Sequence, residues 1–188
     1  MSVTETRFAA SILEHLPALC ALTASSVVSY LRLKPHYWSA GFGYLGDRDR
    51  EATIRIPPTE NAPGADRARQ FNLEFRAADA AACPHLALAV LVLAGMRGIR
   101  GIREELSEPS LVKGDPSGLG EEDRRRLGVR PLPASLEEAL EAPEGDASVR
   151  SWLSRDLFDC YVGVKRTEIS LLEGADPEEA CGRYGRIY

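Results

Sequence analysis

Apolar side chains recur every three or four residues near the start of the chain, which is the spacing of one face of an α-helix. They predict a helix from about Thr6 to Ala24. Pro17 lies inside this stretch, and because proline lacks a backbone N–H we expect it to kink the helix or to divide it in two. A second, short helical piece is predicted from Ser25 to Leu31.

The region from Gly41 to Arg76 changes to a period of two, which is typical of strands. Three strands are predicted, and their apolar positions are Phe42 and Tyr44, then Ile54 and Ile56, then Phe71, Leu73 and Phe75. Between the last two strands, Pro57 to Arg69 is rich in proline, glycine and charge, so we expect a mobile loop there.

The rest of the chain is predicted to be mainly helical. An Ala/Leu/Val-rich helix should run from Pro84 to about Leu106, and because its apolar side is nearly continuous we expect it to pack on both faces. The remaining expectations are a long polar connection from Ser107 to Pro133, a short helix begun by the capping-box spacing of Ser135 and Glu138, a last helix from Ser154 to Leu172, and a docked tail from Glu178 to Tyr188.

Composition limits the possible functions. The chain has 188 residues, 44% hydrophobic and 27% charged, which is typical of one folded soluble domain. Its formal net charge is −5, which argues against nucleic acid as a partner because phosphate backbones bind basic surfaces. The arginines are locally dense, so a small anion is the better candidate ligand.

The cysteines and the apolar runs give the expected location. The four cysteines are scattered and form no C-x-x-C pair (Cys20, Cys83, Cys160 and Cys181), which favours reduced thiols over disulfides or a zinc site. The longest apolar run, Leu86 to Gly95, is too short to cross a membrane. The first residues lack the features of a signal peptide, so we expect a cytoplasmic protein with no membrane partner.

Glu74 and Arg76 are the first candidate site residues. On a strand they share one face with Asn72, while the apolar residues between them face the core. A carboxylate is a suitable ligand for Mg²⁺ or Mn²⁺, and an arginine can hold a substrate carboxylate through two hydrogen bonds. Taken alone, the segment from Phe71 to Arg76 fits a solvated Arg–Glu pair on a sheet face better.

Three more arginines are candidates for binding anions. Arg50 and Arg55 lie at the start of a predicted strand and within it, where they could neutralise a polyphosphate. Interleaved acidic residues leave open a salt-bridged surface turn instead. Arg32, one turn before a proline, fits either a cation at a helix C-terminus or a pocket residue. No P-loop, no Rossmann glycine pattern and no metal-type histidine pair is present.

Taken together, the order of these motifs resembles the glutamine synthetase family. The matching stretches are Leu22 to Leu33, Arg50 to Pro57, Glu74 to Ala89, Leu93 to Ile99, Leu132 to Leu140, and Val164 to Glu168. They match the C-terminal half of that family's catalytic domain. The resemblance implies an α+β fold in which antiparallel strands form part of an active-site sheet packed by helices. Residues 1–188 would be a single half-domain, with the N-terminal domain and the first catalytic half absent.

The resemblance also implies roles for matched positions. Arg32 and Arg76 would hold the carboxylate substrate, and Arg50, Arg55 and Arg69 the phosphates of ATP, with Arg32 and Arg50 acting in catalysis. Glu74 would bind the Mg²⁺ or Mn²⁺ that bridges those phosphates. In such enzymes ATP phosphorylates a carboxylate, and ammonia or an amine then displaces phosphate to give an amide.

The chain departs from the family pattern at three positions. Trp38 stands where the family has a flap glutamate that shields the acyl phosphate and helps to deprotonate ammonium. Asn72 replaces a phosphate-contacting arginine, for which Arg69 could partly compensate, and Cys83 replaces the asparagine of an A-N-P motif. Trp38 would suit an amine or a substrate other than ammonia and glutamate.

Three hypotheses follow. The first is a subunit of a split ATP-dependent carboxylate–amine ligase, active only with a second protein chain that carries the missing half, within a higher hetero-oligomer. The second is a non-catalytic relative with an interaction or regulatory role. The third is a piece of a longer protein. A single candidate carboxylate, Glu74, cannot hold two or three metal ions, which is why a partner is expected.

Overall fold

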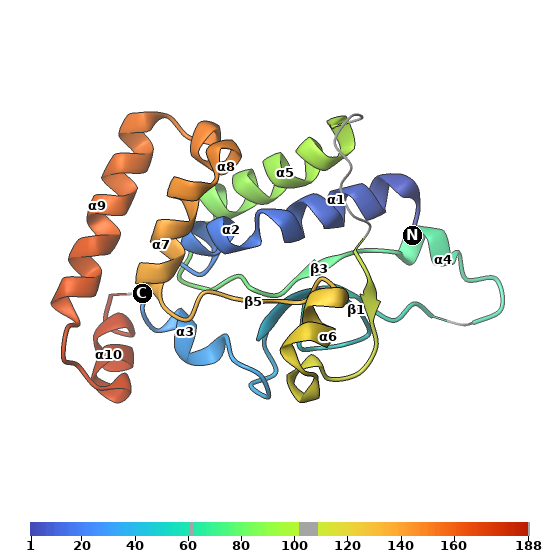
Figure 1. Cartoon of the computed structure of the whole chain (residues 1–188), viewed down its shortest axis with the longest axis horizontal. Coiled ribbons are helices and arrows are strands. Elements are labelled where there is room, and N and C mark those ends of the chain that lie inside the picture. The colour runs from blue at the N-terminus through green and yellow to red at the C-terminus, as the bar shows by residue number, and fades with distance from the viewer. Residues whose placement is uncertain (61, 102–108, 188) are drawn as a thin grey trace.

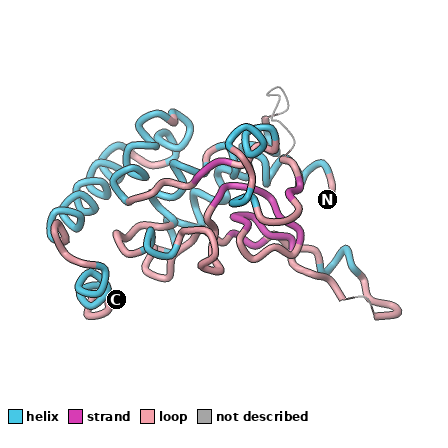
Figure 2. The backbone as a smooth tube through the Cα atoms, turned by 60° about the horizontal axis from the view of Figure 1, so that its bottom comes forward, coloured by secondary structure: helices cyan, strands magenta, loops and turns pink. Residues whose placement is uncertain are grey.

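The computed structural model describes residues 1–60, 62–101 and 109–187. It has the expected α+β fold: a small sheet lies against helices from both halves of the chain (Figures 1 and 2). Within the described residues, no helix is long and apolar enough to cross a membrane.

The N-terminal helix is divided at the predicted place. α1 (Val3–Glu14) begins with a capping box between Ser2 and Glu5, and α2 (Leu16–Thr23) begins one residue after α1's C-cap, His15. Pro17 occupies the first turn of α2, where its missing N–H costs nothing. Every residue of α2 except Pro17 is buried, so this helix forms the centre of the core. The predicted helical piece after it is one turn, α3 (Ser29–Arg32).

The sheet is mixed rather than antiparallel throughout. Its strands are β1 (Phe42–Asp47), β2 (Ala52–Ile56), β3 (Glu74–Phe75), β4 (Leu111–Val112) and β5 (Arg130–Pro131). They follow the order β3-β2-β1-β4, and β5 also pairs with β1. The β2–β3 and β1–β5 pairs are antiparallel, whereas β1 runs parallel to β2 and β4. The predicted third strand was too long. Phe71 is the C-cap of α4 (Arg67–Gln70), and regular strand pairing begins only at Glu74.

α5 (Pro84–Arg100) packs closely against α1 and also contacts α2 and α8. A Cβ atom added at Gly95 would lie 2.0 Å from the Phe8 ring, and one added at Gly98 would lie 2.2 Å from the Arg7 carbonyl oxygen. The two helices can therefore approach this closely only because both positions are glycine. The expectation of packing on both faces is wrong within the described residues, because Leu88 is 65% exposed on the other face. The predicted end of this helix near residue 106 lies outside the described residues.

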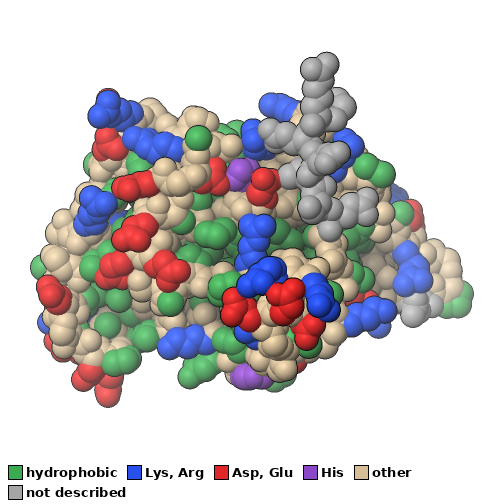
Figure 3. Space-filling model, viewed as in Figure 1, with side chains coloured by type: hydrophobic (Ala, Val, Ile, Leu, Met, Phe, Trp, Pro, Cys, Tyr) green, Lys and Arg blue, Asp and Glu red, His purple; other side chains and the backbone are tan. Residues whose placement is uncertain are grey.

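The predicted polar connection from Ser107 to Pro133 contains short elements in its described part. They are β4, a 3₁₀ turn η1 (Pro116–Gly118), α6 (Glu121–Arg126) and β5. α6 has acidic residues in its first turn and basic residues in its last, which complements the helix dipole, and both signs of charge gather over it in Figure 3. The sequence pattern did not predict these elements, because they are short and the segment is rich in polar residues.

The last helices follow the predictions more closely. α7 (Leu136–Gly145) is capped by Ser135, α8 (Ala147–Trp152) is additional, and α9 (Arg155–Leu171) and α10 (Pro177–Tyr184) correspond to the predicted helix and tail. The tail docks as expected, because the Tyr184 hydroxyl donates to Glu168 Oε2 at 2.8 Å. The buried His15 Nδ1 lies 2.5 Å from Asp146 Oδ2 and ties α1 and α2 to α8.

We predict that Gly98→Ala lowers the free energy of unfolding by about 1–2 kcal/mol, because overpacking at the α1–α5 contact outweighs the gain in helix propensity. Chemical denaturation measures the change. Gly163→Ala in α9 is the matched control: nothing lies within 4 Å of its added Cβ, so it should not destabilise the chain. Equal effects of the two substitutions would contradict the close packing at Gly98.

Candidate active site

The antiparallel pairing of β2 and β3 sets the centre of the site. Arg55 lies directly opposite Glu74 in the register, so the two side chains share one face of the sheet. Arg55 Nη1 donates to Glu74 Oε2 at 2.9 Å, and Arg76 Nη1 donates to Glu74 Oε1 at 2.6 Å. The Glu74 carboxylate is therefore held between two guanidinium groups. We call these three residues the Arg–Glu–Arg group.

The two arginines keep Glu74 ionised. Burial of the carboxylate raises the pKa of Glu74, but the hydrogen bonds from Arg55 and Arg76 outweigh it and hold that pKa below its ordinary value. Both guanidinium groups are largely buried, with 15% and 18% of their side-chain surface exposed, whereas Glu74 is 38% exposed. Two positive charges against one negative charge leave this part of the surface suited to an anion.

Arg76 also joins two loops to the sheet. Its Nε donates to the Arg50 carbonyl oxygen at 2.8 Å, and its Nη2 donates to the Trp38 carbonyl oxygen at 2.9 Å. All three of its polar positions are thus engaged, and each goes to a different segment of the chain. Arg76 is consequently as much an organiser of the site as a candidate ligand for a substrate.

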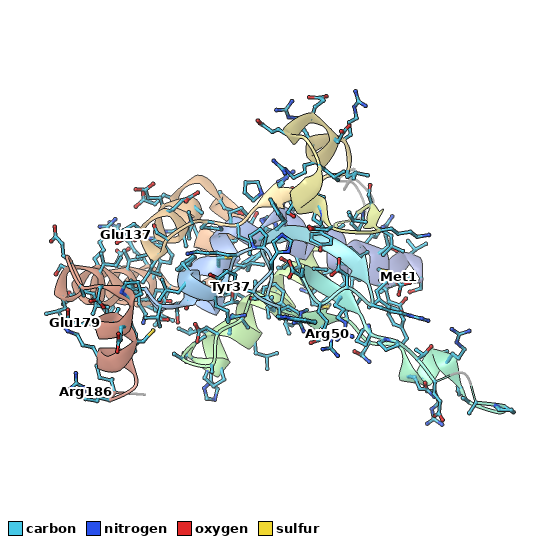
Figure 4. All side chains as sticks on the ribbon, turned by 90° about the horizontal axis from the view of Figure 1, so that it is seen from below. Met1, Tyr37, Arg50, Glu137, Glu179 and Arg186 are labelled. Carbon is cyan, nitrogen blue, oxygen red and sulfur yellow. The ribbon has the colours of Figure 1, made fainter. Side chains whose placement is uncertain are left out.

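The loop at residues 36–38 is joined to the Arg–Glu–Arg group by the bond from Arg76 to the Trp38 carbonyl oxygen, whereas His36 Nε2 lies 3.2 Å from the Ser117 hydroxyl oxygen. His36 and Trp38 both have positive φ angles, 67° and 54°, which few non-glycine residues adopt. The loop is held by the His36 N–H, which donates to Glu51 Oε2 at 2.8 Å. Trp38 is 69% exposed, and the Arg50 guanidinium lies over its ring, 5.7 Å from the centroid. Figure 4 shows Tyr37 and Arg50 in the central part of the molecule.

Arg32 contacts the residue that follows the same loop. Its Nη1 donates to the Ser39 hydroxyl and its Nη2 to the Ala78 carbonyl oxygen, the latter at 2.8 Å. It therefore connects the loop to the segment that follows Arg76. Arg32 also lies in the last turn of α3, so both alternatives left open by the sequence, a helix C-terminal cation and a pocket residue, stay predictions.

Two expected contributors lie apart from this arrangement. Arg69 is exposed on α4, and its side chain has no contact with the Arg–Glu–Arg group within the described residues. Asn72 donates from Nδ2 to the Gln70 carbonyl oxygen and lies outside β3.

Two arginines for which the sequence predicted no role, Arg48 and Arg67, line a hollow of about 270 Å³ beside the ends of β1 and β2. Only their nearness to the predicted loop could have indicated them.

The described residues fit part of a metal and phosphate site. Arg55 Nε is buried without a hydrogen-bond partner, so the guanidinium has a donor still to be satisfied. Glu74 is an ionised oxygen ligand with lone pairs left after its two hydrogen bonds. However, no group of three His, Cys, Asp or Glu residues suitable for a metal occurs in the described part of the chain. Glu74 thus fits one ligand position of a divalent-ion site and cannot make the whole site.

Known proteins are similar to this chain in sequence and in fold. Residues 1–181 match the family profile described as glutamine synthetase, catalytic domain. The gamma-glutamylpolyamine synthetase GlnA3 of Streptomyces coelicolor is 38% identical over 98% of this chain and 38% of its own length. For the glutamine synthetase of Methanocaldococcus jannaschii the corresponding values are 32%, 98% and 38%. The chain therefore spans about two fifths of the length of the curated relatives it matches.

A solved structure gives the same result in three dimensions. The crystal structure of a novel glutamine synthase homolog has a TM-score of 0.80 and 40% sequence identity, and the match covers 100% of this chain and 39% of that one. The similarity in three dimensions thus agrees with the match of the sequence to the family profile. The resemblance to the glutamine synthetase family, predicted from the motifs, is confirmed.

Glu74→Gln should change how stability depends on pH. Because the folded pKa of Glu74 lies below its unfolded value, its ionised form stabilises the fold above the unfolded pKa, and this contribution is lost as pH falls through the folded pKa. We expect the variant to be less stable than the native chain at neutral pH and the difference to shrink in acid. Urea denaturation from about pH 7 to pH 3 measures it. Glu137→Gln, on an exposed carboxylate, is the control, and a pH-independent difference for Glu74→Gln would contradict the assigned pKa direction.

Proposed function

Because the chain belongs to the glutamine synthetase catalytic-domain family, we propose that it contributes part of the active site of an ATP-dependent carboxylate–amine ligase. The observation that carries this proposal is the Arg–Glu–Arg group: an ionised carboxylate fixed between two arginines on paired strands. The reaction would transfer the terminal phosphoryl group of ATP to a carboxylate, after which an amine nitrogen attacks the activated carbonyl carbon and phosphate leaves.

The arginines would supply charge and position in this reaction. Arg55 and Arg50 would contact phosphate oxygens, and Arg76 and Arg32 would hold the carboxylate substrate and the acyl phosphate made from it. Charge that develops on phosphoryl oxygens is stabilised best by donors already held in place. The contacts of Arg76 and Arg32 to backbone carbonyls provide such positioning, while the exposed Arg50 is free to turn from Trp38 toward a ligand. Arg69 would have to move with α4 to take part.

Glu74 would serve as one ligand of Mg²⁺ or Mn²⁺. The ion, when bound, neutralises phosphate charge and polarises the phosphoryl oxygens. The further carboxylates that such a site requires would come from polypeptide outside the described residues, carrying the complementary half of the family's catalytic domain. We propose that this half is a second protein chain and that the active form is a hetero-oligomer.

The amine substrate is proposed to be larger than ammonia and positively charged. A relative at 38% identity is a gamma-glutamylpolyamine synthetase. By the match to the family's motif order, the exposed Trp38 would stand where the family has a carboxylate that favours ammonium, and the Arg50 guanidinium lies 5.7 Å from its ring centroid. An aromatic face attracts alkylammonium groups while also burying their methylene carbons. When Arg50 turns to a phosphate, this ring face becomes available to the amine.

A non-catalytic interaction or regulatory role is the second candidate. It is favoured by one observation: both Glu74 oxygens are engaged by arginines, and no second carboxylate accompanies them within the described residues. In that case, the chain would retain the fold, with or without nucleotide binding, and would form complexes without phosphate release.

We predict that Glu74→Ala weakens Mg²⁺-dependent ATP binding about 100-fold or more in the assembled ligase, because even the loss of a hydrogen-bond partner to a metal ligand costs about 10–100-fold. Isothermal titration with and without Mg²⁺ measures this. Glu137→Ala, at an exposed position in the first turn of α7, should bind ATP normally. Unchanged binding by Glu74→Ala would remove Glu74 from the metal site, and ATP-dependent phosphate release by the 188-residue chain alone would contradict the half-site assignment.

Trp38→Glu should shift preference from a polyamine toward ammonia. Loss of a cation–π contact worth about 0.5–2 kcal/mol corresponds to a decrease of about 2- to 30-fold in kcat/KM for a diamine. The rate with ammonia should fall less or rise. Trp38→Phe, which keeps an aromatic face, should retain most activity with the diamine. Phosphate release with each amine as the variable substrate gives both values, and an equal loss for both amines would argue against Trp38 as a specificity residue.

A further inference from the structure

The loop at residues 36–38 has a further attachment, to the 3₁₀ turn η1, which the proposed chemistry does not use. His36 Nε2 lies 3.2 Å from the Ser117 hydroxyl oxygen and 3.7 Å from Asp115 Oδ2. The Ser117 hydroxyl donates to the same Asp115 oxygen at 2.7 Å. His36 and Ser117 are 81 positions apart in the chain, so this contact exists only through the fold. We call these three residues the imidazole clamp.

The direction of the hydrogen bonds in the clamp follows from the number of protons. A serine hydroxyl has one hydrogen, and that of Ser117 is donated to Asp115. The Ser117 oxygen can therefore only accept from the imidazole, so Nε2 of His36 carries a proton. Hydrogen bonds from the Ser117 hydroxyl and the Ser117 N–H lower the pKa of Asp115, so the clamp ends on an ionised acceptor.

The turn that receives His36 is itself firmly held. Asp115 is the N-cap of η1 and accepts from the Ser117 N–H at 2.8 Å. Arg124 of α6 donates from Nη1 to the Leu119 carbonyl oxygen at 2.7 Å, and its guanidinium lies 5.3 Å from the ring centroid of Phe42, the first residue of β1. The clamp thus connects the loop to the sheet through η1 and α6.

The backbone of the loop requires such support. His36 and Trp38 have positive φ angles, a conformation that residues other than glycine keep only where their surroundings impose it. The contacts that impose it include the clamp, the His36 N–H bond to Glu51 and the Arg76 bond to the Trp38 carbonyl oxygen. The clamp acts through the His36 side chain, so a change of that side chain leaves the two backbone contacts in place.

We propose that His36 is a positioning residue, which through Ser117 and Asp115 fixes the loop so that Trp38 presents its ring to the amine substrate. The role toward the amine rests on the proposed function, whereas the restraint on Trp38 does not. Trp38 is 69% exposed, so the position of its ring depends on the loop backbone more than on surrounding side chains. A cation must lie within about 6 Å of a ring centroid to be attracted, and a mobile loop would lose that alignment.

Fluorescence of Trp38 in the 188-residue chain tests the restraint directly. Trp38 and Trp152 are the two tryptophans of the chain, so Trp152→Phe leaves Trp38 as the single reporter. In this background, Ser117→Ala and His36→Ala should lose most of the slow component of the Trp38 time-resolved anisotropy, because the loop then moves independently of η1. Ser117→Thr, which keeps the hydroxyl, should retain that component. Ser170→Ala, which removes an exposed hydroxyl from α9, is the matched control and should also retain it.

Amine kinetics test the role in the assembled ligase. Ser117→Ala and His36→Ala should raise KM for a diamine about 2- to 12-fold, the effect of one hydrogen bond, and leave KM for ATP unchanged. His36→Gln, whose amide nitrogen can still donate to Ser117, should restore part of the native KM. A general loss of structure would instead lower kcat and change both KM values.

Each outcome decides the proposal. Circular dichroism and the unfolding midpoint establish that the variants fold, and His36→Gly, which suits a φ of 67° and removes the imidazole, repeats the test if His36→Ala does not fold. Native anisotropy in both Ser117→Ala and the His36 variant overturns the clamp. A loosened Trp38 with an unchanged KM for the diamine overturns the role in amine binding. If the native assembly releases no phosphate from ATP with any amine, the ligase function is refuted, while the anisotropy still decides whether the clamp holds Trp38.

Discussion

The ion pairs between one carboxylate and two guanidinium groups are the contact on which the candidate site depends. Glu74 is placed opposite Arg55 by the β2–β3 register, and Arg76 follows it on the same face. A shift of one residue in that register would turn Glu74 to the other face of the sheet and leave the arginines without their counter-charge. The backbone hydrogen bonding between β2 and β3 continues beyond β3, where the Arg76 N–H donates to the Thr53 carbonyl oxygen at 2.8 Å.

This arrangement also explains how an acidic chain can present a site for anions. Whole-chain charge describes solubility and long-range attraction, whereas a binding site responds to the few charges within one Debye length. Around Glu74 the positive side chains outnumber the negative ones. Arg76 also donates to the Trp38 carbonyl oxygen, so the same side chain that balances the charge of Glu74 holds the loop at residues 36–38.

The apolar core and the site have related requirements. α2 is almost entirely buried between other elements, and α1 approaches α5 so closely that glycine is needed at the contact. This supports α5 from one side only. Within the described residues, Leu88 on α5 is exposed and β3 is a terminal strand of the sheet.

The sequence by itself determined the helix division at Pro17, the long helices beginning at Pro84 and near Arg155, and the family, because apolar periodicity, proline and the order of motifs are local properties of the chain. It also placed Glu74 and Arg76 on one face of a strand through the period of two. The tertiary structure decided what lies opposite them. Strand direction, the partnership of Arg55 with Glu74 and the stacking of Arg50 on Trp38 join residues distant in sequence, and no local pattern encodes such pairings. The short strands after residue 108 were also missed, because two residues are too few to show a period. The uncovered face of α5 was beyond sequence as well, since an apolar helix has the same pattern whether its second neighbour is present or not.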